Sequence, residues 1–200
     1  MSVHVINYDR QRMARWEPDS RGRLEQAAFA LYAERGFEHT TVAEIAQRAG
    51  VTERTFFRHF ADKREVLFAG SGALQDLLAS TVVEAPDGVT PIDAVAAAIE
   101  AAGAQLEERR ERARQRQAVI AANAELRERE LIKLASLAAA LADALRQRGV
   151  SEPAASLTAE AGIAVLRIAV ERWVDEANKR SLPELVRDSF GQLRAVTAGR

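Results

Sequence analysis

The short segment from Thr52 to His59 concentrates side chains that can bind an anionic polymer. Its sequence, Thr-Glu-Arg-Thr-Phe-Phe-Arg-His, places hydroxyl, guanidinium and imidazole groups within eight positions. Hydroxyls and cations donate hydrogen bonds to phosphate oxygens, and an arginine can pair through two hydrogen bonds with the edge of a guanine base. The chemistry that this segment predicts is therefore binding to nucleic acid.

Catalytic chemistry finds little support elsewhere in the chain. There are no cysteines, which excludes thiolate nucleophiles, thiolate metal sites and disulfides. The three histidines are scattered and form neither a His-x-x-x-His nor a Glu-x-x-His pair, the spacings that hold zinc on a helix. Gly70-Ser71-Gly72 falls in a region predicted to be helical, so it does not follow a strand as a phosphate-binding loop does. We therefore predict no enzyme activity, no catalytic residue, no metal and no cofactor.

The composition indicates an all-α protein. Of the 200 residues, 48% are hydrophobic but only 6% are aromatic, and alanine supplies much of the apolar content. Alanine favours helices, whereas strands prefer β-branched and aromatic residues. No apolar run approaches the roughly 20 residues that span a bilayer, and residues 1–19 lack the apolar stretch of a secretory signal. We expect a cytoplasmic protein with no membrane partner.

The net charge by itself argues weakly against nucleic-acid binding. The chain carries 28 basic and 29 acidic residues, for a formal charge of −1, whereas nucleic-acid-binding proteins usually have a basic surface. Dividing the chain after Gly70 shows little asymmetry. Residues 1–70 carry 11 basic and 10 acidic residues, and residues 71–200 carry 17 basic and 19 acidic residues. The argument for nucleic-acid binding must therefore come from the local placement of charge.

Apolar spacing, capping residues and glycines predict the helices that position residues 52–59. Apolar spacing predicts a helix from Arg21 that stops at Gly36. Thr41-Val42-Ala43-Glu44 reads as a capping box that opens a short helix over residues 42–49. After the break at Gly50, Thr52 is the expected N-cap of a second short helix, which runs to about Phe60. Asp62-Lys63-Arg64-Glu65 is a further N-cap candidate, from which we predict a longer helix through Leu78.

Residues 42–60 have the layout of a helix-turn-helix. The first helix needs a small residue where the second crosses it, which Ala46 supplies, and the turn needs a residue that tolerates positive φ, which Gly50 supplies. Phe56 and Phe60 would then be buried. An ordinary helical hairpin could share this spacing, but it would not need basic and hydroxyl groups on its second helix.

This region resembles the TetR/AcrR family of transcriptional regulators. The resemblance covers residues 21–68, about a quarter of the chain, and rests on several motifs in order: Ala27-Ala28-Phe29, Gly36-Phe37, Thr40-Thr41-Val42, Ile45-Ala46, Ala49-Gly50-Val51, Thr55-Phe56-Phe57-Arg58-His59-Phe60 and Lys63. It implies a three-helix DNA-binding head, a larger helical body that binds ligand and dimerises through its last two long helices, and repression that a small molecule relieves.

The resemblance also assigns roles to single residues. It implies phosphate contacts for Thr41, His59 and Lys63. Arg54 and Thr55 are the candidates for base edges, with Thr52 and Arg58 beside them and Arg58 able to reach either backbone or base. The family commonly has tyrosine where this chain has Phe57, so one hydrogen bond to phosphate is lost, although the ring can still pack on sugars or thymine methyls.

Residues 1–19 form a basic arm with Arg10, Arg12 and Arg15. Such an arm can reach an adjacent minor groove, and a solubilising tail is an equally good interpretation. We expect the head to occupy residues 20–66 and the body residues 67–200.

The body is expected to contain a linker at residues 84–89 and further helices from Pro91, from Glu125 to Arg148, from about Ser151 to Lys179 and from Ser181. Regularly spaced leucines predict a packed core, and the exposed apolar edges of the last two helices predict a homodimer interface.

Arg109, Arg112 and Arg116 share one helical face and are candidates to hold an anionic ligand head group, with Trp173 as a lining residue. A solvated charged face is the simpler interpretation, because acidic residues are interleaved with the arginines. The segment from Arg116 to Arg129 is similar to regulators that sense acyl-CoA. The resulting hypothesis is a repressor that a lipophilic anion releases from its double-stranded DNA operator; the alternative is an all-helical interaction adaptor without DNA binding.

Overall fold

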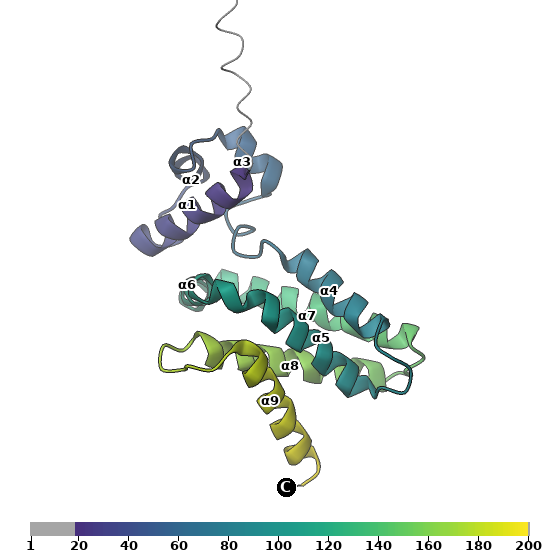
Figure 1. Ribbon diagram of the computed structural model, residues 1–200. Helices are drawn as coiled ribbons and strands as arrows, with labels where there is room; N and C mark the ends of the chain where they lie inside the picture. Colours follow the sequence, from purple (N-terminus) through teal and green to yellow (C-terminus); the bar gives the residue numbers. More distant parts are fainter. Residues whose placement is uncertain (1–18, 200) are drawn as a thin grey trace, which may run out of the picture. The chain divides into compact units, whose positions relative to one another are not determined.

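The computed structural model describes residues 19–199, and this part of the chain is helical, without a β-strand. Its elements in chain order are α1 (Ser20–Arg35), α2 (Val42–Arg48), α3 (Glu53–His59), α4 (Ser71–Val83), α5 (Pro91–Leu106), the 3-10 helix η1 (Glu107–Arg109), α6 (Arg110–Ala122), α7 (Ala124–Gln147), α8 (Ala154–Val174) and α9 (Leu182–Thr197) (Figure 1). The predicted all-α class is confirmed. The chain divides into two compact units between Val66 and Leu67. Within residues 19–199, none of the helices combines the length and apolar character needed to span a bilayer.

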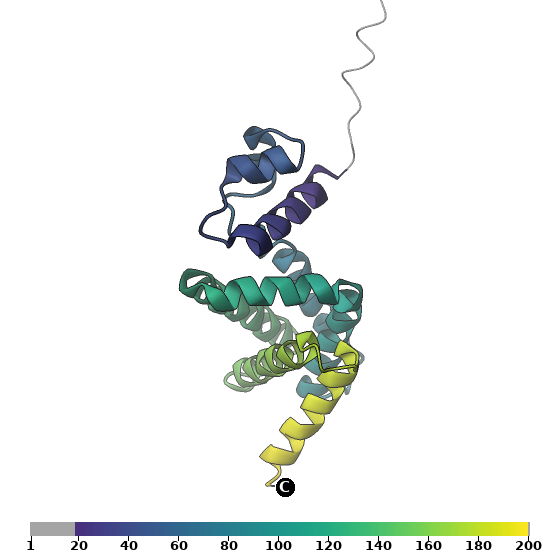
Figure 2. The same ribbon diagram turned by 90° about the vertical axis from the view of Figure 1, so that its left-hand side faces the viewer.

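Unit 1, up to Val66, has a core to which each of its three helices contributes at least one fully buried apolar side chain. Leu24 of α1, Ile45 of α2 and Phe56 of α3 have no exposed surface. The three helices pack on one another in both ribbon views (Figures 1 and 2). Because α2 and α3 each bury few apolar residues, the burial of Ile45 and Phe56 determines how these two short helices are oriented in the unit.

The predicted caps at Thr41 and Ser181 are confirmed. At α2, the Thr41 side chain accepts a hydrogen bond from the backbone of Glu44 (3.2 Å), whose carboxylate accepts from the backbone of Thr41 (2.9 Å). Ser181 forms the equivalent capping box at α9. Gly36 ends α1 with φ 83°, a left-handed conformation that glycine adopts without strain.

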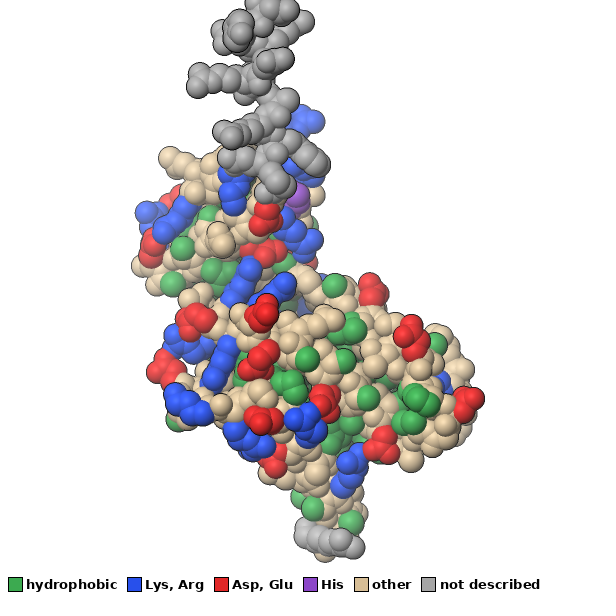
Figure 3. Space-filling model, viewed as in Figure 1, with side chains coloured by type: hydrophobic (Ala, Val, Ile, Leu, Met, Phe, Trp, Pro, Cys, Tyr) green, Lys and Arg blue, Asp and Glu red, His purple; other side chains and the backbone are tan. Residues whose placement is uncertain are grey.

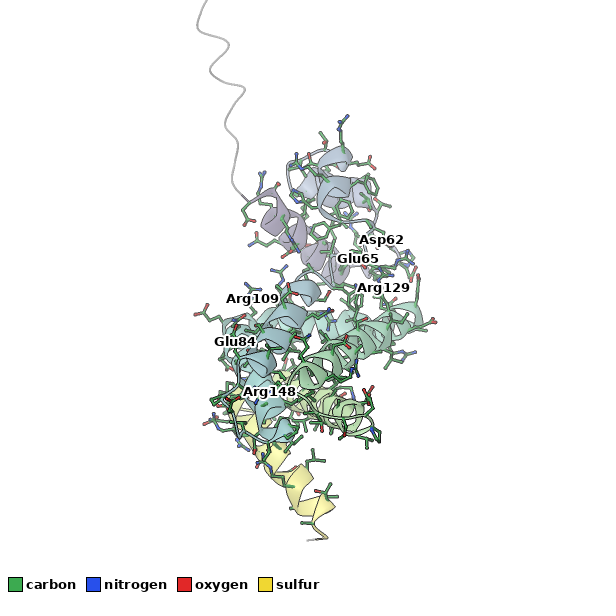
Figure 4. All side chains as sticks on the ribbon, turned by 90° about the vertical axis from the view of Figure 1, so that its right-hand side faces the viewer. Asp62, Glu65, Glu84, Arg109, Arg129 and Arg148 are labelled. Carbon is green, nitrogen blue, oxygen red and sulfur yellow. The ribbon has the colours of Figure 1, made fainter. Side chains whose placement is uncertain are left out.

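The prediction that a helix starts near Lys63 is wrong. Residues 61–70 form turns, and α4 begins at Ser71, after Gly70 with φ 91°. The carboxylate of Asp62 accepts from the backbone amides of Arg64 (2.8 Å) and Glu65 (3.1 Å), which closes a turn; Asp62 and Glu65 are labelled in Figure 4. The consecutive residues 66–68 are all buried, a pattern that one face of a helix does not provide.

Unit 2, from Leu67, buries its apolar side chains between layered helices. Helix α7 packs against α4 and α8, and α5 packs against α4, α8 and α9 (Figure 1). The core contains large side chains from each of these helices: Leu78, Ile99, Leu141, Leu145, Leu166, Trp173 and Phe190. The regularly spaced leucines of α7 are not all in the core: Leu126, Leu137, Leu141 and Leu145 are buried, but the side chain of Leu131 is exposed.

Arginine side chains hold two connections of unit 2. Arg148 donates to the carbonyls of Val83 (3.3 Å) and Pro86 (3.0 Å) and so holds the predicted linker between α4 and α5; Figure 4 labels Arg148 and the linker residue Glu84. Arg110 donates to the carbonyls of Asp175 (2.9 Å) and Asn178 (2.6 Å).

The Arg110 contacts explain why α8 is shorter than predicted. The sequence predicts a helix to about Lys179, but α8 ends at Val174 and Asp175 is extended (φ −61°, ψ 130°). The guanidinium of Arg110 satisfies backbone carbonyls that a continuing helix would use internally.

Gly162 brings α8 close to α5. A Cβ at this position would lie 2.4 Å from Cγ1 of Val95 and 3.2 Å from Cδ1 of Ile99. We expect Gly162→Ala to lower the free energy of unfolding by about 1–3 kcal/mol, because the branched Val95 side chain must shift in a packed core. The matched control is Gly72→Ala in α4, where a Cβ meets nothing within 4 Å. Urea denaturation of both variants at equal concentration measures the difference, and equal stability would contradict this account.

Candidate nucleic-acid interface

The turn between α2 and α3 is set by backbone hydrogen bonds. The amide of Val51 donates to the carbonyl of Ala46 (3.0 Å) across Gly50, which has φ 67°. Thr52 then caps α3 by accepting from the amide of Thr55 (3.2 Å). Ala46 is buried, as expected for the residue at the helix crossing. The geometry is that of the predicted helix-turn-helix.

Helix α3 separates its buried and exposed residues cleanly. Phe56 and Phe60 face the interior of unit 1, and their rings lie 5.5 Å apart. Thr52, Arg54 and Arg58 are exposed, as is Phe57, whose exposed fraction of 54% is unusual for an aromatic side chain. Thr55 and His59 flank this surface and are half-buried. We call Thr52, Arg54, Thr55, Phe57, Arg58 and His59 the α3 surface.

Three arginines of unit 1, Arg48, Arg35 and Arg21, are held in ion pairs. Arg48 forms two hydrogen bonds to the carboxylate of Glu34 (2.5 and 2.7 Å), which ties α2 to α1. Arg35 donates to Glu44 (2.7 Å), and Arg21 to Glu25 (3.2 Å).

Arg54 and Arg58, by contrast, have no hydrogen bond or ion pair within residues 19–199. Among the arginines and lysines of the described part of unit 1, these two present guanidinium groups that no protein acceptor engages. Because both lie on the exposed side of α3, the α3 surface carries available positive charge even though the basic and acidic residues of the unit balance.

Hydrogen bonding keeps the supporting carboxylates charged. The backbone and side chain of Thr41 lower the pKa of Glu44, and hydrogen bonding from Arg48 lowers the pKa of Glu34.

Burial, together with the nearby charge of Asp62, raises the pKa of Tyr32 far above its usual range. The Tyr32 hydroxyl therefore stays protonated and donates to the carbonyl of Lys63 (2.6 Å).

Three residues expected to contact phosphate already have partners inside unit 1. The Thr41 hydroxyl takes part in the α2 cap and donates to Glu44 (2.8 Å). The Nε2 atom of His59 shares a hydrogen bond with Oγ of Ser20 at the start of α1 (2.8 Å). The ammonium of Lys63 donates to backbone carbonyls rather than standing free. It also does not lie at a helix start, contrary to the sequence prediction, because α4 begins at Ser71.

The sequence analysis missed the residues that support this surface. Ser20 and His59 are 39 positions apart, and no short-range pattern links them. The pair between Glu34 and Arg48 spans 14 positions across two helices, so helical periodicity cannot reveal it. The predicted basic arm with Arg10, Arg12 and Arg15 lies outside the described residues.

The candidate ligand residues of unit 2 lie in different surroundings. Arg109, on η1 and labelled in Figure 4, is exposed and has no partner within residues 19–199. Arg112 is half-buried. The Trp173 side chain has no exposed surface, and its Nε1 atom donates to Glu107 (3.4 Å). The structure thus places Trp173 in the core and Arg109 at the surface.

Arg116 is held by three different groups of unit 2. Its Nε atom donates to the carbonyl of Leu67 (2.7 Å), its Nη1 atom to Glu130 of α7 (2.9 Å), and its guanidinium lies 5.1 Å from the centre of the Phe68 ring. On the face of unit 2 seen in Figure 3, basic and acidic side chains lie intermixed. Within residues 19–199, no group of three or more His, Cys, Asp or Glu side chains is arranged to hold a metal ion.

Family models match both parts of the chain. Residues 25–69 match the model described as bacterial regulatory proteins, tetR family. Residues 89–198, more than half of the chain, match the MftR C-terminal domain, one of the TetR C-terminal domains.

Curated relatives are transcriptional regulators. The HTH-type transcriptional regulator TcmR of Streptomyces glaucescens is 38% identical over 82 residues, which are 41% of this chain and 36% of that protein. The HTH-type transcriptional repressor KstR2 of Mycobacterium tuberculosis is 45% identical over 47 residues, 24% of either chain. The matches thus span about a quarter to a third of the length of these relatives.

Solved structures show the same fold over most of the chain. A putative transcriptional regulator from Pseudomonas aeruginosa PAO1 has a TM-score of 0.64 and 22% identity, with 96% of this chain and 97% of that chain covered. The regulator FadR from Bacillus subtilis, in complex with stearoyl-CoA, has a TM-score of 0.62 and 22% identity, with 86% and 96% covered. With both family models matched in order on a helix-turn-helix unit and a helical second unit, the chain belongs to the TetR family of bacterial transcriptional regulators.

Proposed function

We propose that this protein is a homodimeric repressor that binds a double-stranded DNA operator through the α3 surface and is released by a small molecule. The observation that carries the proposal is the pair Arg54 and Arg58, which have no protein partner within residues 19–199 and lie on the exposed side of a helix-turn-helix. A helix of this kind enters the major groove, where arginine reads base edges. In this proposal residues 20–66 bind DNA, and residues 67–200 bind the ligand and form the dimer.

The residues of the α3 surface divide by the chemistry of their contacts. Arg54 and Thr55 are proposed to meet base edges, while Arg58 and His59 meet the backbone on either side. Phe57 has no hydroxyl to donate to phosphate, so its exposed ring is proposed to pack on a thymine methyl or on deoxyribose. Thr52 is the exposed N-cap residue of α3, and its hydroxyl oxygen accepts a hydrogen bond from the amide of Thr55.

Arginine substitutions test the DNA assignment. We expect Arg54→Ala to lower operator affinity and to relax discrimination at particular base pairs by about 1–3 kcal/mol, because a bidentate base contact is lost. Arg58→Ala should weaken binding to operator and random DNA alike, because Arg58 is proposed to contact the DNA backbone. Fluorescence anisotropy with the upstream region of the protein's own gene and a scrambled duplex measures both effects.

The matched control for these variants is Arg146→Ala, which removes a cation paired with Asp143 and Glu152 at the end of α7, outside the proposed dimer interface, and should leave DNA affinity unchanged. The absence of any sequence-specific binding at low salt by the unmodified protein would favour an adaptor without DNA binding.

We further propose that the effector is a lipophilic anion, with an acyl-CoA as the first compound to test. The arginines of η1 and α6 support this: Arg109 is free to meet a head group, and Arg116 joins α6 to Leu67, the first residue of unit 2. An anion that displaces Glu130 from Arg116 would alter the contact with Leu67, which directly follows the DNA-binding unit in the chain. The similar fold of FadR, solved with stearoyl-CoA, makes this ligand class a natural probe.

Titration with stearoyl-CoA tests the effector. We expect the thermal midpoint of the protein to rise and its affinity for the operator to fall, because the ligand binds one state preferentially. Arg109→Ala should weaken both responses, whereas Arg146→Ala should not. Free CoA and a neutral alkane of matched length are the ligand controls. An unchanged midpoint together with unchanged operator affinity would rule out this class of effector.

The homodimer is proposed to form on α8 and α9. Leu157 and Ile168 on α8 and Val196 on α9 are large apolar side chains with exposed fractions of 68%, 42% and 73%. In both ribbon views, the end of α9 extends beyond the other helices of unit 2 (Figures 1 and 2). Helices that expose such residues are suited to a two-fold helical interface.

A charge placed on α8 tests this interface. We expect Ile168→Glu to shift the protein from dimer to monomer in light scattering coupled to size-exclusion chromatography, because two carboxylates would be buried near the two-fold axis. Ile132→Glu is the matched control, since Ile132 on α7 is 60% exposed and lies outside the proposed interface. Dissociation by both variants, or by the control alone, would contradict the assignment.

A further inference from the structure

We propose that Lys63 is a positioning residue of the DNA-binding unit, whose ammonium holds the loop between α1 and α2 and does not contact phosphate. The inference rests on the proposed DNA binding and assigns Lys63 a role within it. Its starting point is the surroundings of the Lys63 side chain, which comes from the turns that follow α3 and reaches back to the end of α1.

The ammonium group of Lys63 is fully engaged by the protein. Its Nζ atom donates to the carbonyls of Phe37 (2.8 Å), Thr40 (2.9 Å) and Glu38 (3.3 Å). An ammonium has three hydrogens to donate, and three carbonyls take them. The Nζ atom also lies 4.4 Å from the centre of the Phe37 ring, so the charge is further stabilised by the aromatic face.

The three carbonyls belong to the loop that determines where α2 begins. The loop follows Gly36, the residue that ends α1, and leads directly into Thr41, the N-cap of α2. Thr40 has an exposed fraction of 1%, and its hydroxyl donates to the carbonyl of Gly36 (2.9 Å). The loop carbonyls therefore converge on one cation, which favours a single loop conformation and a single start for α2.

Lys63 is also held from its backbone side. The hydroxyl of Tyr32, on α1, donates to the carbonyl of Lys63 (2.6 Å), and burial keeps that hydroxyl protonated. The neighbouring turn is closed by the carboxylate of Asp62, which accepts from the amides that follow Lys63. The residue thus connects α1, the α1–α2 loop and the turns after α3.

Two accounts of Lys63 make different predictions about salt. Each phosphate contact releases a counterion when DNA binds. The loss of one contact therefore makes the negative slope of log affinity against log salt concentration shallower by about 0.9. A positioning residue changes affinity at every salt concentration but leaves the slope unchanged. The substitution Lys63→Met removes the ammonium and keeps the length of the stem, and Arg58→Gln serves as the control that removes a proposed DNA contact.

We expect Lys63→Met to bind the operator roughly tenfold more weakly, in line with the loss of charged hydrogen bonds. The slope of log affinity against log salt should equal that of the unmodified protein. The measurement is made at a temperature where circular dichroism shows the variant fully folded, so global unfolding does not contribute. Arg58→Gln should make the slope shallower. A slope that becomes shallower by about 0.9 in Lys63→Met would overturn the proposal.

Hydrogen exchange in the full chain without DNA tests the positioning directly. We expect the amides of Thr41, Glu44 and Ile45 to exchange faster in Lys63→Met, while those in unit 2 do not change. Unchanged exchange at α2 would overturn the proposal. This readout does not depend on DNA, so it separates failure of this inference from failure of the proposed DNA binding, which would show as no operator affinity in the unmodified protein.

Lys63→Arg is the conservative variant that distinguishes the accounts further. A guanidinium keeps the charge and can bind phosphate, but its planar donors do not converge on three carbonyls around one point. We expect Lys63→Arg to exchange faster at α2 and to bind the operator more weakly than the unmodified protein, as Lys63→Met does. If Lys63→Arg matched the unmodified protein in both measurements, the proposal would be overturned. If Lys63→Met does not fold, Tyr32→Phe removes the hydrogen bond to the Lys63 carbonyl and should produce the same local increase in exchange.

Discussion

Phe56 lies in the middle of α3 without exposed surface, and its ring packs against that of Phe60. A seven-residue helix makes about two turns, so one buried aromatic side chain determines which way the whole helix faces. With Phe56 buried, as Leu24 of α1 and Ile45 of α2 are, Arg54, Phe57 and Arg58 face outward. The proposed DNA-binding surface is in this sense a consequence of how the core of unit 1 is packed.

The electrostatics of unit 1 depend on pairing more than on net charge. The overall charge of −1 and the balanced charges of the head argue against DNA binding only if every cation counts equally. They do not, because Arg48, Arg35 and Arg21 are neutralised by carboxylates of the same unit. Arg54 and Arg58 are left to carry the local field. A near-neutral protein can thus present a cationic recognition helix, because the range of such fields is about 10 Å at 0.1 M salt.

The connection at residues 61–70 joins the two proposed activities. Lys63 reaches back into unit 1, while Leu67 offers its carbonyl to Arg116 of unit 2. A regular helix through this stretch would direct successive side chains around one axis. The turns instead allow Lys63 and Val66 to pack with the first unit and Leu67 and Phe68 with the second. In the proposed mechanism, an effector that acts on Arg116 reaches unit 1 through this connection in the chain.

The sequence by itself determines the features that depend on neighbouring residues. The caps at Thr41, Thr52 and Ser181, the turn at Gly50 and the all-helical class follow from local hydrogen bonding and propensity, and the structure has each of them. The family resemblance in residues 21–68 likewise depends on ordered local motifs. Only the tertiary structure decided the partners of Lys63, His59 and Arg116, because these contacts join positions 14 to 49 residues apart. Such contacts form when helices pack, and the packing is set by the whole core rather than by any local pattern.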